Sequence, residues 1–375
     1  MQVRVCNDKG LWNYFVNASP YSLPDHFWEH ADVHVIVYER DKVVLIPFTK
    51  RRFMGFNILL SYGLRRSGGP FPASTIHDLS WATRIVPRVI NSLIQDYGYN
   101  AINITLKTYV NVYYRLVLRE LLRYYRRKNY MKLLRYMLRA RVLDVENKSY
   151  EEIWWKHYNK KARNAVRKFM KNKGEVRRLG NPLVYLKDIL LCNLSSPKRQ
   201  GKPLPPTYTN PFLVYKGLKQ IARYMEDKKA QVYGAFLDNK LVGYSYVIYH
   251  NGYAYISRFL IHAHYTRYCI GEGLLDGIIR DLIKQKIRKI QYGYWSPRSA
   301  PGIDHFLRQF GFREGIEQAL IICSESRGIG YLALKILLDM RRSWENPSKP
   351  PLMTKSYGNY ILRSILRKAY ESFLI

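Results

Sequence analysis

Residues 254–286 read AYISRFLIHAHYTRYCIGEGLLDGIIRDLIKQK. The first part, 254–261, has the composition of a strand, residues 262–269 form a polar turn, and 274–286 have the apolar spacing of an amphipathic helix. Gly271 and Gly273 stand where that helix begins. The first amides of a helix have no partner inside it and lie at the positive end of its dipole. The stretch therefore predicts a strand–turn–helix unit whose turn binds a pyrophosphate.

The same plan occurs twice along the chain. Residues 35–46, VIVYERDKVVLI, predict two strands joined by a tight turn, and residues 233–244, YGAFLDNKLVGY, repeat the pattern with a lysine after the turn in both copies. Each hairpin is later followed by an amphipathic helix and then a short strand. These helix and strand pairs are 85–97 with 101–106, and 274–286 with 289–294. We therefore expect a mixed α/β protein made of two related modules.

The length of 375 residues suits two domains that each bury a core. We expect a first module over residues 1–145, a second over 146–325, and a basic helical tail over 326–375. In the tail, Ile361, Ile365, Ala369 and Phe373 follow one side of a helix, which predicts that it docks on the protein or lies on an anionic membrane.

The charge balance is strongly basic. The chain has 62 Lys and Arg against 28 Asp and Glu, a formal net charge of +34, and it also has 33 tyrosines. Such a surface favours a polyanionic partner, and nucleic acid, an anionic membrane and a phosphate-rich substrate all fit. A basic surface that only solvates the protein is the alternative.

Four cysteines lie far apart, without the spacing of a disulfide framework or a metal site. We expect reduced thiols, no metal, and an intracellular protein. Neither a signal peptide nor a spanning helix is predicted, which places the protein in the cytoplasm, with the inner membrane face as an alternative location.

The most basic segment lies between the two modules. Ser149 and Glu152 form a capping box, so a helix is expected over about residues 150–173, ending at Gly174. Its apolar stripe runs from Trp154 to Phe169, with cations opposite. The candidates for contact with an acceptor or a polyanion are Lys156, Lys160, Arg163, Arg167, Lys168 and, in a later loop, Arg199.

A closing segment makes the pattern specific. Residues 291–295, QYGYW, predict a strand, and residues 302–312, GIDHFLRQFGF, predict a short helix that ends in Phe-Gly-Phe. This order resembles the acetyltransferase fold called GNAT. The spacing of Gly302, Phe306, Phe310 and Gly311 is similar to the closing motif of the Fem-type (FemAB-like) family, whose members are two fused GNAT-like modules.

Three further stretches resemble that family: 61–70, SYGLRRSGGP; 160–168, KKARNAVRK; and 198–203, KRQGKP. The chain departs from the family pattern at three positions. Leu307 stands where the family has a lysine, Tyr294 where it has an arginine, and Tyr268 where GNAT proteins have glutamine or arginine.

The resemblance implies an acyltransferase that moves an acyl group from acyl-coenzyme A, or an aminoacyl group from aminoacyl-tRNA, to an amine. The second module would bind the donor, and the first would be a degenerate copy. The residues expected at the donor site are Arg267, Tyr268, Gly271, Glu272 and Gly273.

Acyl transfer from an activated donor needs positioning, removal of one proton and stabilisation of an oxyanion. The candidates for proton handling are Asp304, His305, Tyr292 and Tyr294, each of which also fits a purely structural position. No arrangement for a covalent acyl-enzyme is evident.

Two other classes of function stay open. One is a nucleic-acid-binding protein on an inactive transferase fold, with tRNA as a partner. The other is a peripheral membrane enzyme that acts on an anionic lipid-linked acceptor and uses the tail as an anchor. The oligomeric state is not predicted from the sequence.

Overall fold

The computed structural model describes residues 2–20, 22–23, 26–28, 31–39, 42–53, 56–60, 71–72, 79–99, 101–107, 112–126, 131–196, 198–199, 202–294 and 301–324. The chain divides into two compact units. Unit 1 consists of Met1–Arg139, Ser296–Arg298 and Ile316–Ile375, and unit 2 of Ala140–Trp295 and Ser299–Gly315. The expected glycine loop at 61–70 and the tail after residue 324 lie outside the described residues. No helix in the described ranges is long and apolar enough to cross a bilayer.

Unit 1 is a mixed sheet with helices. Its strand order is β1-β2-β3-β4-β6-β15, with antiparallel neighbours except for the parallel pair β4 and β6. The strands are β1 (Gln2–Val5), β2 (Val33–Glu39), β3 (Lys42–Phe53), β4 (Phe56–Leu60), β6 (Ala101–Leu106) and β15 (Arg313–Ser324), and the short β5 (Phe71–Pro72) pairs with β3. The helices are α1 (Lys9–Ala18), α2 (Leu79–Gln95) and α3 (Val112–Tyr125).

Unit 2 repeats this plan. Its strand order is β7-β14-β13-β12-β11-β8, antiparallel except for the parallel pair β13 and β14. The strands are β7 (Met131–Asp144), β8 (Glu175–Leu179), β11 (Ala230–Leu237), β12 (Lys240–His250), β13 (Tyr253–Ile261) and β14 (Lys289–Tyr294), and β9 (Lys198–Arg199) forms a small ladder with β10 (Lys202–Pro203).

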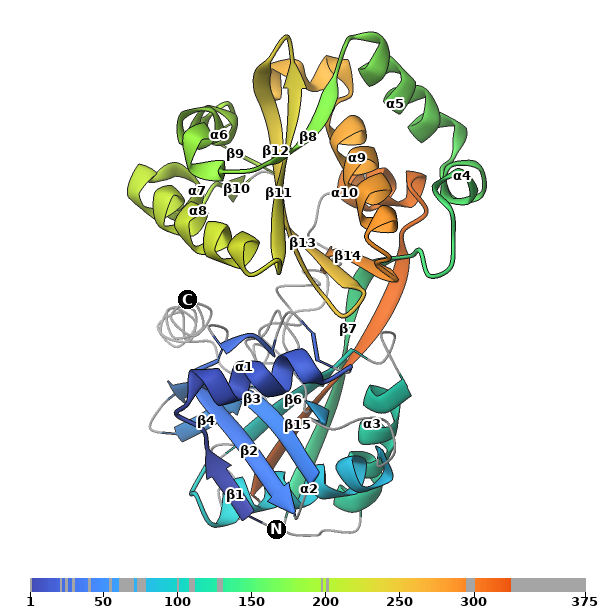
Figure 1. Ribbon diagram of the computed structural model, residues 1–375. Coiled ribbons are helices and arrows are strands. Elements are labelled where there is room, and N and C mark those ends of the chain that lie inside the picture. The colour runs from blue at the N-terminus through green and yellow to red at the C-terminus, as the bar shows by residue number, and fades with distance from the viewer. Residues whose placement is uncertain are drawn as a thin grey trace, which may run out of the picture. The chain divides into compact units, whose positions relative to one another are not determined.

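Helices cover both faces of the sheet in unit 2 (Figure 1). On one face lie α6 (Leu186–Leu194), α7 (Pro206–Thr209) and α8 (Pro211–Glu226), preceded by the 3₁₀ turn η5 (Pro182–Tyr185). On the other face lie α5 (Lys160–Lys171) and α9 (Ile270–Lys284). The core is built around α9, whose side chains Ile270, Leu274, Leu275, Ile278 and Ile279 are all buried.

The predicted duplication is confirmed by the hairpins. In unit 1 the register of β2 and β3 runs from Val33 opposite Phe48 to Glu39 opposite Lys42. In unit 2 the register of β11 and β12 ends at Leu237 opposite Lys240. In both units the strand after the hairpin, β4 or β13, pairs in parallel with the strand that follows the next long helix, which is β6 after α2 and β14 after α9.

The last strand of each unit crosses from the other part of the chain. Strand β7 follows α3 of unit 1, but its residues from Ala140 pair with β14 in unit 2. Strand β15 follows α10 (Pro301–Gln309) of unit 2, but its residues from Gln318 pair with β6 in unit 1. Each sheet therefore needs both halves of the sequence.

The basic helix differs from the prediction of one continuous helix over about 150–173. It consists of α4 (Tyr150–Glu152), the π-helical turn η4 (Ile153–His157), a break at Tyr158, and α5. The break occurs because Asn159 accepts a hydrogen bond from the Ala162 amide and so begins a new helix. The predicted capping box is confirmed at its first half, since the Glu152 amide donates to Ser149 Oγ at 3.1 Å.

Candidate functional site

Strands β13 and β14 run together for only four residue pairs. Their parallel register extends from Tyr253 and Lys289 to Ile256 and Tyr292, and β13 then continues for the rest of its length. On the opposite side of β13, a bulge at Ser257 interrupts the pairing with β12. Because a bulge bends its strand, β13 and β14 diverge toward their carboxyl ends. This divergence lies directly before the segment that leads into α9.

A left-handed residue opens α9. The 3₁₀ turn η6 (Ala263–Tyr268) ends at Cys269, which has φ 59° and ψ 39° and supplies no side-chain cap. The first amide that bonds inside the helix is that of Gly273, which donates to the Cys269 carbonyl at 3.0 Å. Among the described residues, no acceptor is found for the amides of residues 270–272. Three N–H groups at the positive end of the helix dipole are therefore available to an anion.

The two glycines of this turn have different surroundings. A Cβ on Gly271 would meet Ile261 and Phe259 of β13 and Phe306 of α10 at 3.7–3.9 Å, which is ordinary contact distance. A Cβ on Gly273 would lie 2.2 Å from Phe169 Cδ1 of α5. The missing side chain of Gly273 lets α5 pack on α9. A role of Gly273 in donor binding stays a prediction.

Aromatic rings line the region where β13 leaves β14. Phe259 lies 5.6 Å from Tyr292 and 6.3 Å from Phe306, measured between ring centroids, and Phe306 lies 5.4 Å from Phe310. Phe310 continues this cluster to the buried Tyr158 at 4.7 Å. Tyr292 and the closing-motif phenylalanines are thus brought together with Gly271.

Asp304 is held by an arginine. Its Oδ1 accepts a hydrogen bond from Arg141 Nε at 2.5 Å, and both side chains are largely buried, at 19% and 8% exposure. His305, its neighbour on α10, is exposed. The pair of Arg141 and Asp304 joins β7 to α10. The side chain of Tyr294 lies outside the described residues.

The remaining donor-site candidates are close together in sequence and in space. Arg267 is exposed, donates to the Tyr268 hydroxyl at 2.8 Å, and lies 4.8 Å over the Tyr268 ring. Glu272 is half-buried in the first turn of α9. Burial, followed by the charge of Glu272, raises the pKa of the Cys269 thiol above its usual value. Cys269 is therefore a poor nucleophile at neutral pH.

Helix α5 presents a cationic outer face. It contains no acidic residue, and its buried side chains Ala162, Val166 and Phe169 pack inward. The side chains exposed on it include Lys160, Lys161, Arg167, Lys168 and Lys171. The charge of Lys168 acts to lower the pKa of Cys269, so this lysine lies within electrostatic reach of the turn that opens α9.

The other basic candidates have separate environments. Arg163 is half-buried, and its Nη1 donates to the carbonyl of Tyr158, so it stabilises the break before α5. Lys156 is exposed and pairs with Glu152 at 3.4 Å. Arg199 belongs to β9, and its side chain lies outside the described residues. No contact among the described residues joins these three side chains to the lysines exposed on α5.

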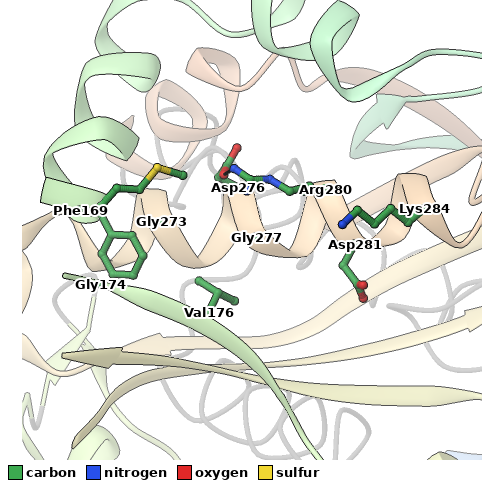
Figure 2. A pocket seen from close by; sticks show the side chains of 10 residues that line it. Phe169, Gly174, Val176, Gly273, Asp276, Gly277, Arg280, Asp281 and Lys284 are labelled. Carbon is green, nitrogen blue, oxygen red and sulfur yellow. Dashed lines mark hydrogen bonds and ion pairs between the residues drawn. The ribbon is translucent and has the colours of Figure 1, made fainter. Parts of the chain in front are cut away.

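A hollow lies on α9, between α5 and β8, with a volume of about 270 Å³ (Figure 2). Asp276 in this hollow accepts from Tyr150 at 2.7 Å and from Arg280 at 2.9 Å. Asp281 accepts from Arg178 at 2.6 Å. Because these carboxylates are paired with cations of the same unit, the hollow is a polar seam between helices and not the donor turn.

Sequence reasoning missed three features of this region. They are Arg141 as the partner of Asp304, Phe169 against Gly273, and Val176 against Gly277, where a Cβ would lie 2.7 Å away. The spacing of Gly273 and Gly277 by four residues is a signal of close helix packing that was available in the sequence. In the described ranges, no three His, Cys, Asp or Glu side chains are arranged to hold a metal ion.

Comparison with known proteins finds a family match in the second half of the chain. Residues 204–319 match the family model described as acetyltransferase (GNAT) domain. A comparison with curated proteins finds no match. The family model spans the hairpin, α9, the diverging strands and the closing motif.

Solved structures share the fold of most of the chain. The crystal structure of FemX is 11% identical, with a TM-score of 0.62 over 85% of this chain and 97% of FemX. L-PGS from Bacillus licheniformis is 13% identical, with a TM-score of 0.50 over 85% of this chain and 93% of that one. A conserved protein from Bacteroides thetaiotaomicron is 9% identical, with a TM-score of 0.50 and the same coverage. At these identities the likeness concerns the fold alone.

Proposed function

We propose that the protein transfers an acyl or aminoacyl group to an amine, with the donor bound at the start of α9, because residues 204–319 match the family model of the GNAT acetyltransferase domain and the chain is similar in fold to FemX. Acyl-coenzyme A and aminoacyl-tRNA are the two donors that fit. Both carry phosphate groups as well as an activated carbonyl group. The predicted fold class, two GNAT-like modules, is confirmed by the family match and the repeated order of strands.

The observation that carries the proposal is the position of the strand divergence. Beyond Ile256 and Tyr292, β13 and β14 no longer share a register, and β13 leads through η6 to the uncapped amides of residues 270–272. A donor phosphate on these amides places the rest of the donor along β13, between Phe259 and the closing helix α10. Amide groups of a strand are suited to bind an extended donor and an oxyanion.

The chemistry needs no covalent intermediate on the protein. The donor carbonyl is already activated, so the chain has to hold the amine and donor together and remove one proton. Cys269 is disfavoured as a nucleophile because its thiol pKa is raised. Asp304 is held by its bond to Arg141, and Asp304, His305, Tyr292 and Tyr294 stay as candidates for the proton.

The cationic face of α5 supplies charge for the donor. We assign Lys168 to a donor phosphate because it is exposed on α5 one residue before Phe169, which packs on Gly273 at the start of α9. Lys160, Arg167 and Lys171 extend the same face and suit a longer polyanion, such as the backbone of a tRNA. Leu307, which stands where the family has a lysine, is only 1% exposed and therefore belongs to the core.

The proposal is tested by donor-dependent transfer. The full chain is incubated with labelled acetyl-coenzyme A or with labelled aminoacyl-tRNA in the presence of amine acceptors, and the label transferred is counted. Lys168→Gln removes a charge-assisted contact and is expected to weaken donor use roughly tenfold. The matched control is Lys240→Gln, an exposed lysine in the β11–β12 turn.

A nucleic-acid-binding protein on an inactive fold gives a different result. Its affinity for RNA would fall steeply with salt and would not depend on coenzyme A or on the acyl group. Absence of transfer from either donor, together with such salt-dependent RNA binding, would reject the transferase.

A further inference from the structure

Unit 2 exposes apolar side chains on the sheet face opposite α5 and α9. Of the eleven large hydrophobic residues that are exposed in the described ranges, five lie between residues 184 and 215. They are Val184, Leu191, Leu194, Phe212 and Tyr215, and Val184 and Phe212 are 74% and 70% exposed. We call these five residues, with the cations between them, the α6–α8 surface. Isolated exposed apolar residues are ordinary, but a cluster of this kind marks a binding surface.

The inner sides of these helices explain why the apolar residues point outward. Ile189 and Cys192 of α6 are buried, as are Val214, Leu218 and Ile221 of α8, because α6 and α8 pack against the sheet of unit 2. Figure 1 shows α6, α7 and α8 together on that face. The exposed apolar residues therefore lie on the outer side of the helical layer.

Two ends of the surface are joined through α7. Asn193 Nδ2 donates to the Tyr208 carbonyl at 2.7 Å, which fixes the end of α6 against α7. Leu194 is the next residue along α6, and Phe212 is the second residue of α8, just after α7. Helices α6, α7 and α8 contact one another, so Leu194 and Phe212 belong to one helical layer.

The charges around these residues have one sign. Between residues 182 and 223 the sequence has one acidic residue, Asp188. The cations whose side chains are exposed in the same segment are Lys187, Lys198, Lys216, Lys219 and Arg223. Apolar and cationic side chains are thus interleaved, as on surfaces that lie in the headgroup layer of an anionic membrane.

We propose that the α6–α8 surface binds an anionic lipid bilayer. Phe212, Leu191 and Leu194 enter the boundary between headgroups and acyl chains, and Tyr215 lies at the headgroup level. Lys216 and Lys219 bind lipid phosphates while their stems cover apolar surface. The formal charge of +34 on the chain opposes pairing of this surface with a second copy. The inference goes beyond acyl transfer, which needs no membrane.

Vesicle flotation with the full chain tests the proposal. We expect the protein to float with vesicles of phosphatidylcholine and phosphatidylglycerol, and to remain below vesicles of phosphatidylcholine alone. High salt should weaken the binding, because it screens the lysines. Lys216→Gln and Lys219→Gln should each lower the partition coefficient roughly fivefold.

An apolar variant and a matched control locate the surface. Leu191→Ser combined with Phe212→Ser should abolish flotation, whereas Trp155→Ser removes an equally exposed ring beside α5 and should leave flotation unchanged. Circular dichroism and thermal unfolding verify that each variant is folded. If the apolar double variant does not fold, the two lysine variants still test the surface.

Three outcomes would overturn the proposal. One is failure of the wild-type chain to bind the anionic vesicles. Another is unchanged flotation of folded α6–α8 variants, which would place the membrane contact elsewhere on the chain. The third is a dimer in sedimentation velocity that only the α6–α8 variants dissociate, which would assign the surface to a second copy.

Discussion

Gly273 of α9 faces the ring of Phe169 so closely that a Cβ at position 273 would lie 2.2 Å from Phe169 Cδ1. The helix that carries the donor turn and the helix that carries the cationic face are therefore packed through a glycine. This contact ties the position of Lys168, one residue before Phe169, to the start of α9.

Gly273→Ala is expected to destabilise unit 2 by about 1–3 kcal/mol, because the added methyl group overlaps Phe169. Urea unfolding measures the loss. Gly217→Ala in α8 is the control, since nothing lies within 4 Å of a Cβ there, and it should be neutral or slightly stabilising. Combining Gly273→Ala with Phe169→Leu should restore part of the stability. Equal stability of Gly273→Ala and wild type would refute the packing role.

The pair Arg141 and Asp304 should behave as a coupled unit. Removing one partner leaves a largely buried charge, and Asp304→Asn or Arg141→Met should each cost about 3 kcal/mol. The double variant should lose clearly less than the sum of the two. Chemical denaturation of the four proteins gives the coupling energy. Additive losses would show that the two side chains do not stabilise each other.

His157 should make the stability depend on pH. Burial, with the nearby charges of Lys148 and Arg313, lowers the pKa of His157 below its usual value. A lowered pKa in the folded state means that the unfolded chain binds the proton more readily. The contribution of neutral His157 to the free energy of unfolding is therefore fully present above the usual histidine pKa. It is lost as the pH falls through the pKa of His157 in the folded protein.

The difference between wild type and His157→Gln isolates this effect. Urea unfolding of both proteins at several pH values should show a steeper loss for wild type on acidification. An NMR titration of the imidazole should give a midpoint below that of a free histidine. A midpoint at or above the free value would contradict the assigned environment.

Cys269 should be dispensable for chemistry. Its raised thiol pKa predicts slow alkylation by iodoacetamide near neutral pH, compared with a small thiol. Cys269→Ala should keep most of the transfer activity, because no acyl-cysteine forms. Trapping of an acyl group on Cys269 by mass spectrometry would reverse this conclusion.

Much of the fold was predictable because its signals are local. The two hairpins follow from strand patterns around short polar turns, and the pairing of Leu237 with Lys240 agrees with the predicted turn at Asp238 and Asn239. The order of α9 and β14 follows from an apolar helical pattern that runs into a short strand. Local spacing also predicted the Ser149 cap.

The missed features depend on contacts between distant residues. The break before α5 involves Asn159, whose backbone amide donates to the Gln309 carbonyl at 2.9 Å. The apolar stripe of the sequence continues through this break, so the pattern alone predicts one unbroken helix. Arg141 and Asp304 are 163 positions apart, so no local pattern joins them. The repeat in the sequence also does not predict that β7 pairs with a strand of unit 2 and β15 with a strand of unit 1, because this pairing joins residues far apart in the chain.

Gly273 shows a different limit. A glycine near a helix start has the same appearance in a sequence whether it admits a ligand or a neighbouring helix. Only the position of Phe169 distinguishes the two. Gly271, whose surroundings leave ordinary contact distances, is thus the better position at which to test donor binding.

Donor binding at Gly271 is the most direct test of the central claim. Valine at this position fills space between β13 and α10, where Ile261, Phe259 and Phe306 surround the glycine. Gly217→Val, on the open side of α8, is the control. Isothermal titration calorimetry is carried out with coenzyme A and with an aminoacyl-tRNA. We expect at least one of these ligands to bind wild type and Gly217→Val alike and to bind folded Gly271→Val at least roughly tenfold more weakly. Binding of neither ligand to wild type, or equal binding to Gly271→Val, would contradict a donor site at the start of α9.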